Sequence, residues 1–191
     1  MTFHPKGLIP IKVSAKSARL KFIECGPECI KTKNCTAKCC DAPSRPNGML
    51  VTVLPQEEVA LKKRGAAVVD GILQPEHDCR GCPFKGLDHL CRLHDTPDKP
   101  FGCIASPFML NKCNTLVVRN RYKLLPCYDS SNGLPAYQMF KSSLELLFGT
   151  RTQKLIIHLD NDGGDIYINM EPQIYKNLTK REGTLRGTKL K

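Results

Sequence analysis

The chain of 191 residues contains no tryptophan, and phenylalanine and tyrosine together make up only 6% of it. Proteins that bind single-stranded nucleic acid stack bases on aromatic side chains, so this scarcity argues against such a platform. No apolar run approaches the roughly 18 residues that suggest a transmembrane helix. The sequence also lacks a P-loop, a dinucleotide-binding glycine fingerprint and a serine nucleophile elbow. We therefore expect neither a membrane protein nor one of these common enzyme classes.

Cysteine, in contrast, is abundant, with eleven residues, nine of them between Cys25 and Cys103. They form two groups and two outliers: Cys25, Cys29, Cys35, Cys39 and Cys40; Cys79, Cys82, Cys91 and Cys103; then Cys113 and Cys127. Such groups either cross-link a secreted domain or hold metal. Prolines and charges interrupt the first 24 residues where a secretory signal needs an apolar stretch, so we expect a reducing cytoplasm. Thiols then remain available as thiolate ligands, and their odd number also argues against complete disulfide pairing.

The cysteine spacing does not choose the metal. Four thiolates in a tetrahedron satisfy zinc or the iron of an iron–sulfur cluster equally well. Cys39 and Cys40 are adjacent, and neighbouring side chains usually point apart. Both sulfurs can join one ion only with an irregular backbone, and otherwise they serve two neighbouring sites. Residues 23–48 and 75–107 lack helical or strand periodicity, so we expect metal rather than hydrophobic packing to organise them.

The formal net charge of +11 would suit an anionic partner such as nucleic acid. A zinc ion with four thiolates carries a net charge of −2, however, so two such sites would lower the total to about +7. The basic residues are also scattered rather than gathered on one recognisable motif. We favour an unidentified protein partner or substrate, with nucleic acid less favoured and a membrane not expected.

The pattern of apolar residues predicts an α+β fold. Strands are expected at 49–54 and 116–125, and helices at 56–69, 136–148, 151–159 and 174–178. The prediction is a small, irregular, cysteine-rich domain organised by metal, with a few short strands and C-terminal helices. Its parts are a basic N-terminal arm (1–22) in which 8–13 could add an edge strand, a cysteine-rich metal-binding core (23–130), a helical C-terminal part of the same domain (131–179), and a basic, disordered tail (180–191).

Short motifs surround the cysteines: the Cys39-Cys40 pair, Cys82-Pro-Phe84, Cys91-Arg-Leu-His94, Pro100-Phe-Gly-Cys103 and Ser106-Pro-Phe108. Over roughly residues 22–170 these motifs resemble the YkgJ-like family of zinc- or iron-chelating proteins. Two features depart from the family pattern. The first cysteines are more widely spaced than in the family's compact motif, and Lys99 precedes Pro100 where many members have arginine.

The resemblance implies metal-ligand roles for a set of cysteines: Cys25, Cys35, Cys39, Cys40, Cys82, Cys91 and Cys103. Cys127 is an eighth candidate, and Cys29, Cys79 and His94 are secondary candidates. Eight thiolates would suit two four-cysteine sites, or one iron–sulfur cluster with a separate ion. Cys113 is expected to be a spare thiol.

Three functions are compatible with these residues. The first is a metal-binding module, with zinc or iron as the cofactor. The second is an iron–sulfur or metal-dependent enzyme, because flagellin lysine methylase carries a similar cysteine-rich motif and would imply a protein-modifying methylase-like activity. The third is a nucleic-acid-binding metalloprotein. No histidine and carboxylate constellation typical of acid–base catalysis is legible, so no catalytic residue is assigned.

Overall fold

The computed structural model describes residues 7–24, 30–31, 33, 35–40, 51–76, 81–94 and 96–187, with side chains described up to residue 179. The chain has an α+β fold, as predicted. It divides into two compact units. Unit 1 comprises residues 1–22, 105–119 and 130–191, and unit 2 comprises residues 23–104 and 120–129. Among the described residues, no helix is long and apolar enough to cross a membrane.

Unit 1 is built around a four-stranded mixed sheet with the order β6-β7-β1-β9. Its strands are β1 (Ile9–Val13), β6 (Phe108–Leu110), β7 (Thr115–Val118) and β9 (Ile166–Met170), and a separate pair joins β2 (Lys21–Phe22) to β8 (Leu134–Pro135). β1 runs parallel to β7 and antiparallel to β9, with Ile11 opposite Ile168. The N-terminal strand therefore lies inside the sheet.

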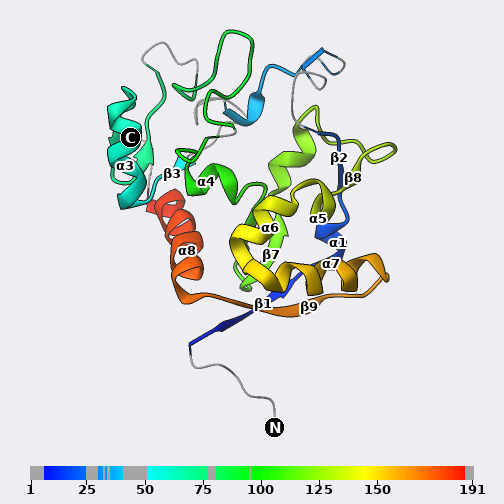
Figure 1. Cartoon of the computed structure of the whole chain (residues 1–191). Coiled ribbons are helices and arrows are strands. Elements are labelled where there is room, and N and C mark those ends of the chain that lie inside the picture. Colours follow the sequence, from blue (N-terminus) through cyan, green and yellow to red (C-terminus); the bar gives the residue numbers. More distant parts are fainter. Residues whose placement is uncertain are drawn as a thin grey trace. The chain divides into compact units, whose positions relative to one another are not determined.

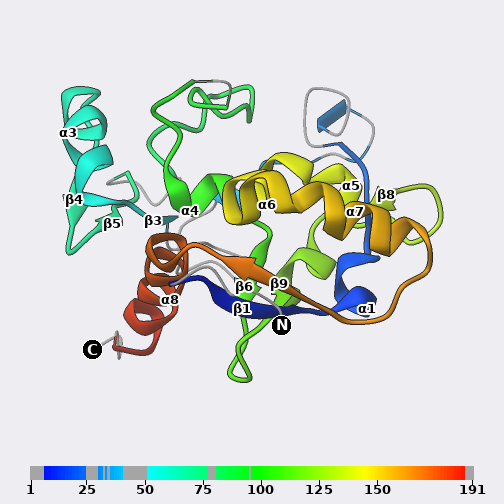
Figure 2. The same cartoon turned by 60° about the horizontal axis from the view of Figure 1, so that its bottom comes forward.

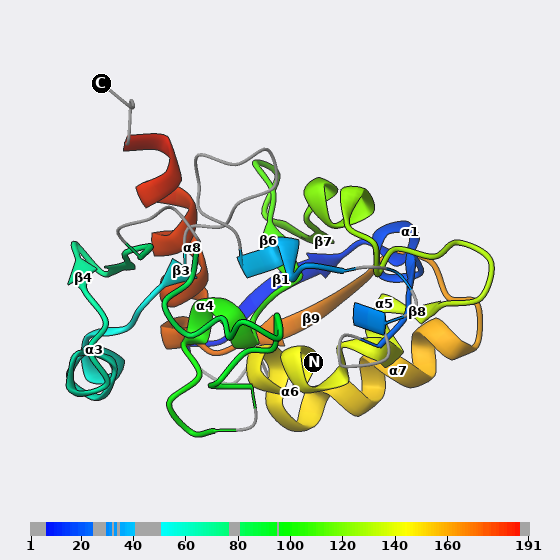
Figure 3. The same ribbon diagram turned by 90° about the horizontal axis from the view of Figure 1, so that it is seen from above.

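The helices of unit 1 are α1 (Ala15–Ala18), α5 (Ala136–Met139), α6 (Lys141–Phe148), α7 (Thr152–Asp160) and α8 (Pro172–Gly187), with the 3-10 turn η3 (Gly149–Arg151). Figures 1 and 3 show α6 and α7 on one face of the sheet. Leu144, Leu147 and Phe148 of α6 are each 1% exposed because they face that sheet at helical spacing. Gly149, with φ of 58°, ends α6 in a conformation that favours glycine.

Unit 2 contains shorter elements. A three-stranded sheet has the order β3-β5-β4, from β3 (Val51–Thr52), β4 (Val68–Val69) and β5 (Ile72–Leu73). The helices are α3 (Pro55–Lys63) and α4 (Phe101–Ile104), with the 3-10 turns η1 (Lys38–Cys40) and η2 (Asn120–Leu124). Pro55 occupies the first position of α3, where its missing N–H costs nothing. Lys62 pairs with Glu58 one turn earlier at 2.6 Å, which adds modest support on the helix surface.

The structure divides the chain differently from the sequence prediction. The prediction assigned residues 105–119 to the core (23–130), whereas the structure places them in unit 1. Unit 1 also contains the predicted C-terminal helical part (131–179). The predicted basic arm (1–22) contains β1, which confirms a strand within 8–13, but β1 lies between β7 and β9 rather than at an edge, and Ile11 and Val13 are buried. The helix α8 extends into the predicted tail (180–191) as far as Gly187, and residues 188–191 lie outside the described residues.

Three predicted elements are interrupted. The expected helix at 56–69 ends at Lys63, and Val68–Val69 form β4 instead. The expected strand at 116–125 stops at Val118, and η2 follows, in which Tyr122 is buried while Lys123 and Leu124 are exposed. Leu125 is buried three residues after Tyr122, a spacing typical of a helical turn rather than of a strand. The expected helix at 136–148 breaks at Phe140, which has φ of −110° and ψ of 40°. Its ring packs edge-on against Phe22 and Phe108, at centroid distances of 5.4 and 6.5 Å.

Candidate metal centre

Most of the candidate metal ligands that the structure describes belong to unit 2. Of the eight cysteines that the structure describes, seven belong to unit 2: Cys35, Cys39, Cys40, Cys82, Cys91, Cys103 and Cys127. Cys113 lies in unit 1, exposed in the turn between β6 and β7, where its N–H donates to the Asn111 side chain at 2.9 Å. The remaining predicted ligands Cys25, Cys29 and Cys79 lie outside the described residues.

The Cys39-Cys40 pair lies in irregular backbone, which is what the binding of both sulfurs to one ion would require. Both residues lie in η1, which follows Ala37 in a left-handed conformation with φ of 51°. The Cys40 N–H donates to the Ala37 carbonyl at 2.8 Å and closes the turn. The two sulfur atoms are 3.9 Å apart. Two thiolates on a tetrahedral zinc, each about 2.3 Å from it, would be about 3.8 Å apart, so the spacing fits a shared ion.

A backbone hydrogen bond joins the second cysteine group to the first. The Cys82 N–H donates to the Cys40 carbonyl at 2.8 Å. Residues 82–92 then turn back on themselves, since Lys85 bridges to Cys91 and the Arg92 N–H donates to the Phe84 carbonyl at 2.8 Å. This places Cys91 close enough to Cys82 for their charges to interact. Cys40, Cys82 and Cys91 are thus linked by local backbone structure despite being 51 positions apart in sequence.

The electrostatics of Cys82 are dominated by burial. Burial raises the pKa of the Cys82 thiol to about 11, because a thiolate is poorly solvated there. A hydrogen bond from the Phe84 backbone N–H lowers this pKa, the charges of Cys91 and Glu76 raise it further, and Lys85 lowers it. In the absence of a cation the thiol form is therefore favoured at neutral pH. A bound divalent cation would reverse this preference and deprotonate the sulfur.

Cys103 is placed by the packing of the Pro100-Phe-Gly-Cys103 segment. Glu57 of α3 accepts the Phe101 N–H at 2.8 Å with one carboxylate oxygen and the Leu54 N–H at 2.8 Å with the other. Burial raises the pKa of Glu57, while these two hydrogen bonds lower it. One carboxylate thus fixes the start of α4 against the start of α3. Phe101 is 3% exposed and anchors α4 in the apolar part of unit 2.

Gly102 allows α4 to approach β3 closely. A Cβ atom on Gly102 would lie 2.7 Å from the Thr52 carbonyl oxygen and 2.8 Å from the Thr52 nitrogen. These distances are well inside van der Waals contact, and both atoms belong to the backbone, which cannot rotate away. Glycine in this motif therefore has a packing explanation, and Cys103 is the next residue. Sequence reasoning missed the positioning roles of Glu57 and Gly102, although the motif itself marked the segment.

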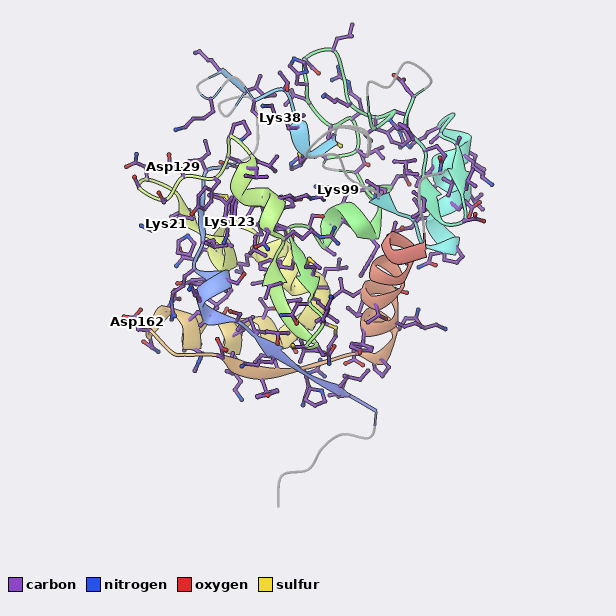
Figure 4. The ribbon with its side chains drawn as sticks, turned by 180° about the vertical axis from the view of Figure 1, so that it is seen from behind. Lys21, Lys38, Lys99, Lys123, Asp129 and Asp162 are labelled. Carbon is purple, nitrogen blue, oxygen red and sulfur yellow. The ribbon has the colours of Figure 1, made fainter. Side chains whose placement is uncertain are left out.

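Cys127 reaches the cysteine-rich loops through the segment 120–129. The Ile23 N–H donates to the Cys127 carbonyl at 2.9 Å, and Lys33 pairs with Asp129 at 3.1 Å. Figure 4 labels Asp129 on the loop that follows η2. Cys35 and Cys127 are both buried. These contacts bring Cys127 into the same unit as the first group, across more than 90 positions of sequence.

His94, a secondary candidate, is exposed, and its backbone N–H donates to the Cys91 carbonyl at 3.2 Å. Within the described ranges, no three cysteine, histidine or acidic side chains converge closely enough to hold an ion by themselves. The donor chemistry nevertheless fits zinc or iron, because thiolates are soft ligands that both metals accept. The described residues supply several sulfurs on neighbouring loops rather than a closed coordination shell.

Comparison with known proteins provides no assignment. No protein-family model, curated protein or solved structure matches this chain.

Proposed function

We propose that unit 2 is a thiolate metal-binding module that holds zinc or iron, the latter as single ions or an iron–sulfur cluster. Its ligands would come from Cys25, Cys35, Cys39, Cys40, Cys82, Cys91, Cys103 and Cys127. The motif resemblance to the YkgJ-like family supports the same ligands. A reducing cytoplasm is the matching compartment, because it keeps thiols available for metal.

The observation that carries the proposal is the gathering of seven cysteines in unit 2 and the exclusion of Cys113 from it. Inert buried cysteines would have no reason to collect on loops joined by the Cys82–Cys40 and Ile23–Cys127 backbone hydrogen bonds. The 3.9 Å separation of the Cys39 and Cys40 sulfurs is a second support, because it is close to the spacing of two ligands on one ion.

Metal would supply what the loops lack in apolar packing. Within residues 35–40, only Cys35 and Ala37 are buried. Ordering a backbone costs roughly 1–2 kcal/mol per residue, which these two small side chains do not offset. When bound, the ion would cross-link the loops and lower the free energy of the folded unit, while the exposed remainder of the chain stays available to a protein partner.

The test is anaerobic purification of the full chain, followed by elemental analysis and a visible absorption spectrum. We expect about one or two zinc ions, or iron with labile sulfide, per chain. Cys91→Ser should lower the metal content, because a neutral hydroxyl cannot replace a thiolate. Cys113→Ser is the matched control and should leave it unchanged. A chain that carries no metal after this purification, and takes up neither added zinc nor added iron, would overturn the proposal.

A further inference from the structure

The strand β9 forms an edge of the unit 1 sheet and lacks the charges and the proline that often protect such an edge. Its sequence, Ile-Tyr-Ile-Asn-Met, contains no charge and no proline. Figures 1 and 2 show it beside β1 at the outer limit of the sheet. The opposite edge strand, β6, is three residues long, and a helix packs near each edge strand, α8 near β6 and α6 near β9. Natural proteins shorten, charge or cover their edge strands to prevent pairing, so an edge of five residues without charge or proline needs an explanation.

The pairing of β1 identifies which groups of β9 point outward. The Ser14 N–H donates to the Leu116 carbonyl of β7, so alternate residues Pro10 and Lys12 also direct their backbone groups away from β9. Ile9, Ile11 and Val13 therefore bond to their β9 partners Met170, Ile168 and Ile166. The backbone N–H and C=O groups of Tyr167 and Asn169 consequently point away from the sheet.

These outward groups make no backbone hydrogen bond to any part of the chain that the structure describes. The Tyr167 side chain is 68% exposed, which is unusual for a large aromatic residue on a monomer surface. The acids that flank the strand are already neutralised within their own chain. Asp165 pairs with Lys12 at 3.0 Å, and Glu171 pairs with Arg151 at 3.0 Å.

We propose that β9 pairs antiparallel with β9 of a second copy of this chain, about a two-fold axis at Ile168. This register places Tyr167 of each copy opposite Asn169 of the other. Two residues opposite each other in an antiparallel ladder exchange both hydrogen bonds when their groups point inward, so the two Tyr167–Asn169 pairs satisfy all the outward groups. The two four-stranded sheets then become one continuous sheet.

The charges agree with this register. In this register residue 165 of one copy lies opposite residue 171 of the other, so the Lys12–Asp165 ion pair of one copy lies near the Arg151–Glu171 ion pair of the other. Each acidic side chain then has a basic side chain of the second copy nearby. The Ile168 side chains lie opposite one another on the face that carries the core, and the Tyr167 ring covers the other face beside Asn169. An isologous contact of this kind closes as a dimer and does not propagate.

The experiment compares full-length variants by sedimentation equilibrium. The wild type should have twice the 21.3 kDa mass of one chain. Asn169→Pro removes one outward N–H per copy and adds a ring that blocks the approach of the second strand, and should raise the dimer dissociation constant about tenfold or more. Asn169→Ala keeps the N–H and is the matched control. If the proline variant does not fold by circular dichroism, Tyr167→Lys replaces it, because an exposed lysine discourages edge pairing.

A wild-type chain that stays monomeric at about 100 µM would overturn the proposal, as would a dimer that both disrupting variants leave equally tight. Hydrogen exchange gives a second readout. The Tyr167 and Asn169 amides should be protected in the wild type at high concentration and lose that protection on dilution, whereas protection that is independent of concentration would contradict pairing between copies.

Discussion

Single residues around the cysteines decide where the sulfurs lie. Neither Glu57 nor Gly102 is a candidate ligand, yet the Glu57 carboxylate accepts the Phe101 N–H at the start of α4, and Gly102 lets α4 contact the Thr52 backbone. Both act through packing and hydrogen bonding that a list of cysteine positions cannot reveal. At this scale, the position of Cys103 depends on its neighbours as much as on its own side chain.

Gly102→Ala should therefore destabilise unit 2. The added Cβ meets backbone atoms at 2.7 and 2.8 Å, and forcing an extra methyl into a packed contact typically costs about 1–3 kcal/mol of unfolding free energy. Urea denaturation followed by circular dichroism measures the change. Gly164→Ala is the control, because nothing lies within 4 Å of a Cβ placed there. Equal stability of the two variants would show that α4 can move away from β3 without cost.

At the scale of elements, Asp165 joins the first strand and helix of unit 1 to the start of β9. Its carboxylate accepts the Ala15 N–H of α1 at 2.9 Å and pairs with Lys12 of β1. The hydrogen bond from Lys12 lowers the pKa of Asp165 most, and the Ala15 N–H lowers it further. The hydrogen bond to the Asp165 carboxylate also favours the charged form of Lys12, so the pKa of Lys12 is raised.

This lowered pKa predicts how stability depends on pH. A carboxyl group whose pKa is lower in the folded state than in the unfolded state stabilises the fold above the unfolded value of about 3.9, and this contribution is lost as the pH falls through the folded value. Asp165→Asn should therefore be less stable than the wild type at neutral pH and should lose less stability on acidification below pH 4. Thermal melts from pH 2 to 7 test this. Asp162→Asn, whose side chain is 99% exposed, is the control and should follow the wild type.

The elements also show what sequence could and could not predict. A helix was predicted at 56–69 from Pro55 and the acidic first turn, and α3 confirms its start, but the helix ends at Lys63 and Val68–Val69 form β4 instead. β9 was missed, although Ile166, Ile168 and Met170 alternate with Tyr167 and Asn169, a spacing typical of a half-buried strand. The break at Phe140 could not be predicted, because it depends on rings from two other segments of the chain. The cysteine motifs marked the candidate ligands, but the hydrogen bonds that join their loops arise only from the fold.

For the whole molecule, the two units differ in how they are stabilised. Unit 1 encloses an apolar core that includes Phe22, Phe108, Leu144, Leu155 and Met170, each no more than 1% exposed. In unit 2 buried apolar side chains lie around the β3-β5-β4 sheet, α3 and α4, and also include Phe84, Leu93, Tyr122 and Leu125, while the cysteine-bearing turn η1 buries little. Metal is therefore expected to matter for one unit and not for the other.

Removal of metal should unfold the cysteine-rich loops of unit 2 and leave unit 1 folded. A strong chelator, or the double variant Cys39→Ser with Cys40→Ser, should make residues 35–40 and 81–94 accessible to protease and to hydrogen exchange. Peptides from β1, β7 and α7 should keep their protection. Loss of protection throughout the chain would show that the two units unfold together, and unchanged protection everywhere would show that metal does not hold the fold.

The inner position of β1 also affects the order in which the chain can fold during its synthesis. β1 is synthesised before unit 2, but its two neighbours in the sheet are β7 and β9, and β9 ends only at Met170. Unit 2 is complete at residue 129. On the proposed function, unit 2 can therefore bind metal before β9, the last partner of β1, has been synthesised. On that function, limited metal supply during translation would leave β1 unpaired and the thiols of unit 2 without metal at the same time, a stage at which exposed apolar surface favours aggregation.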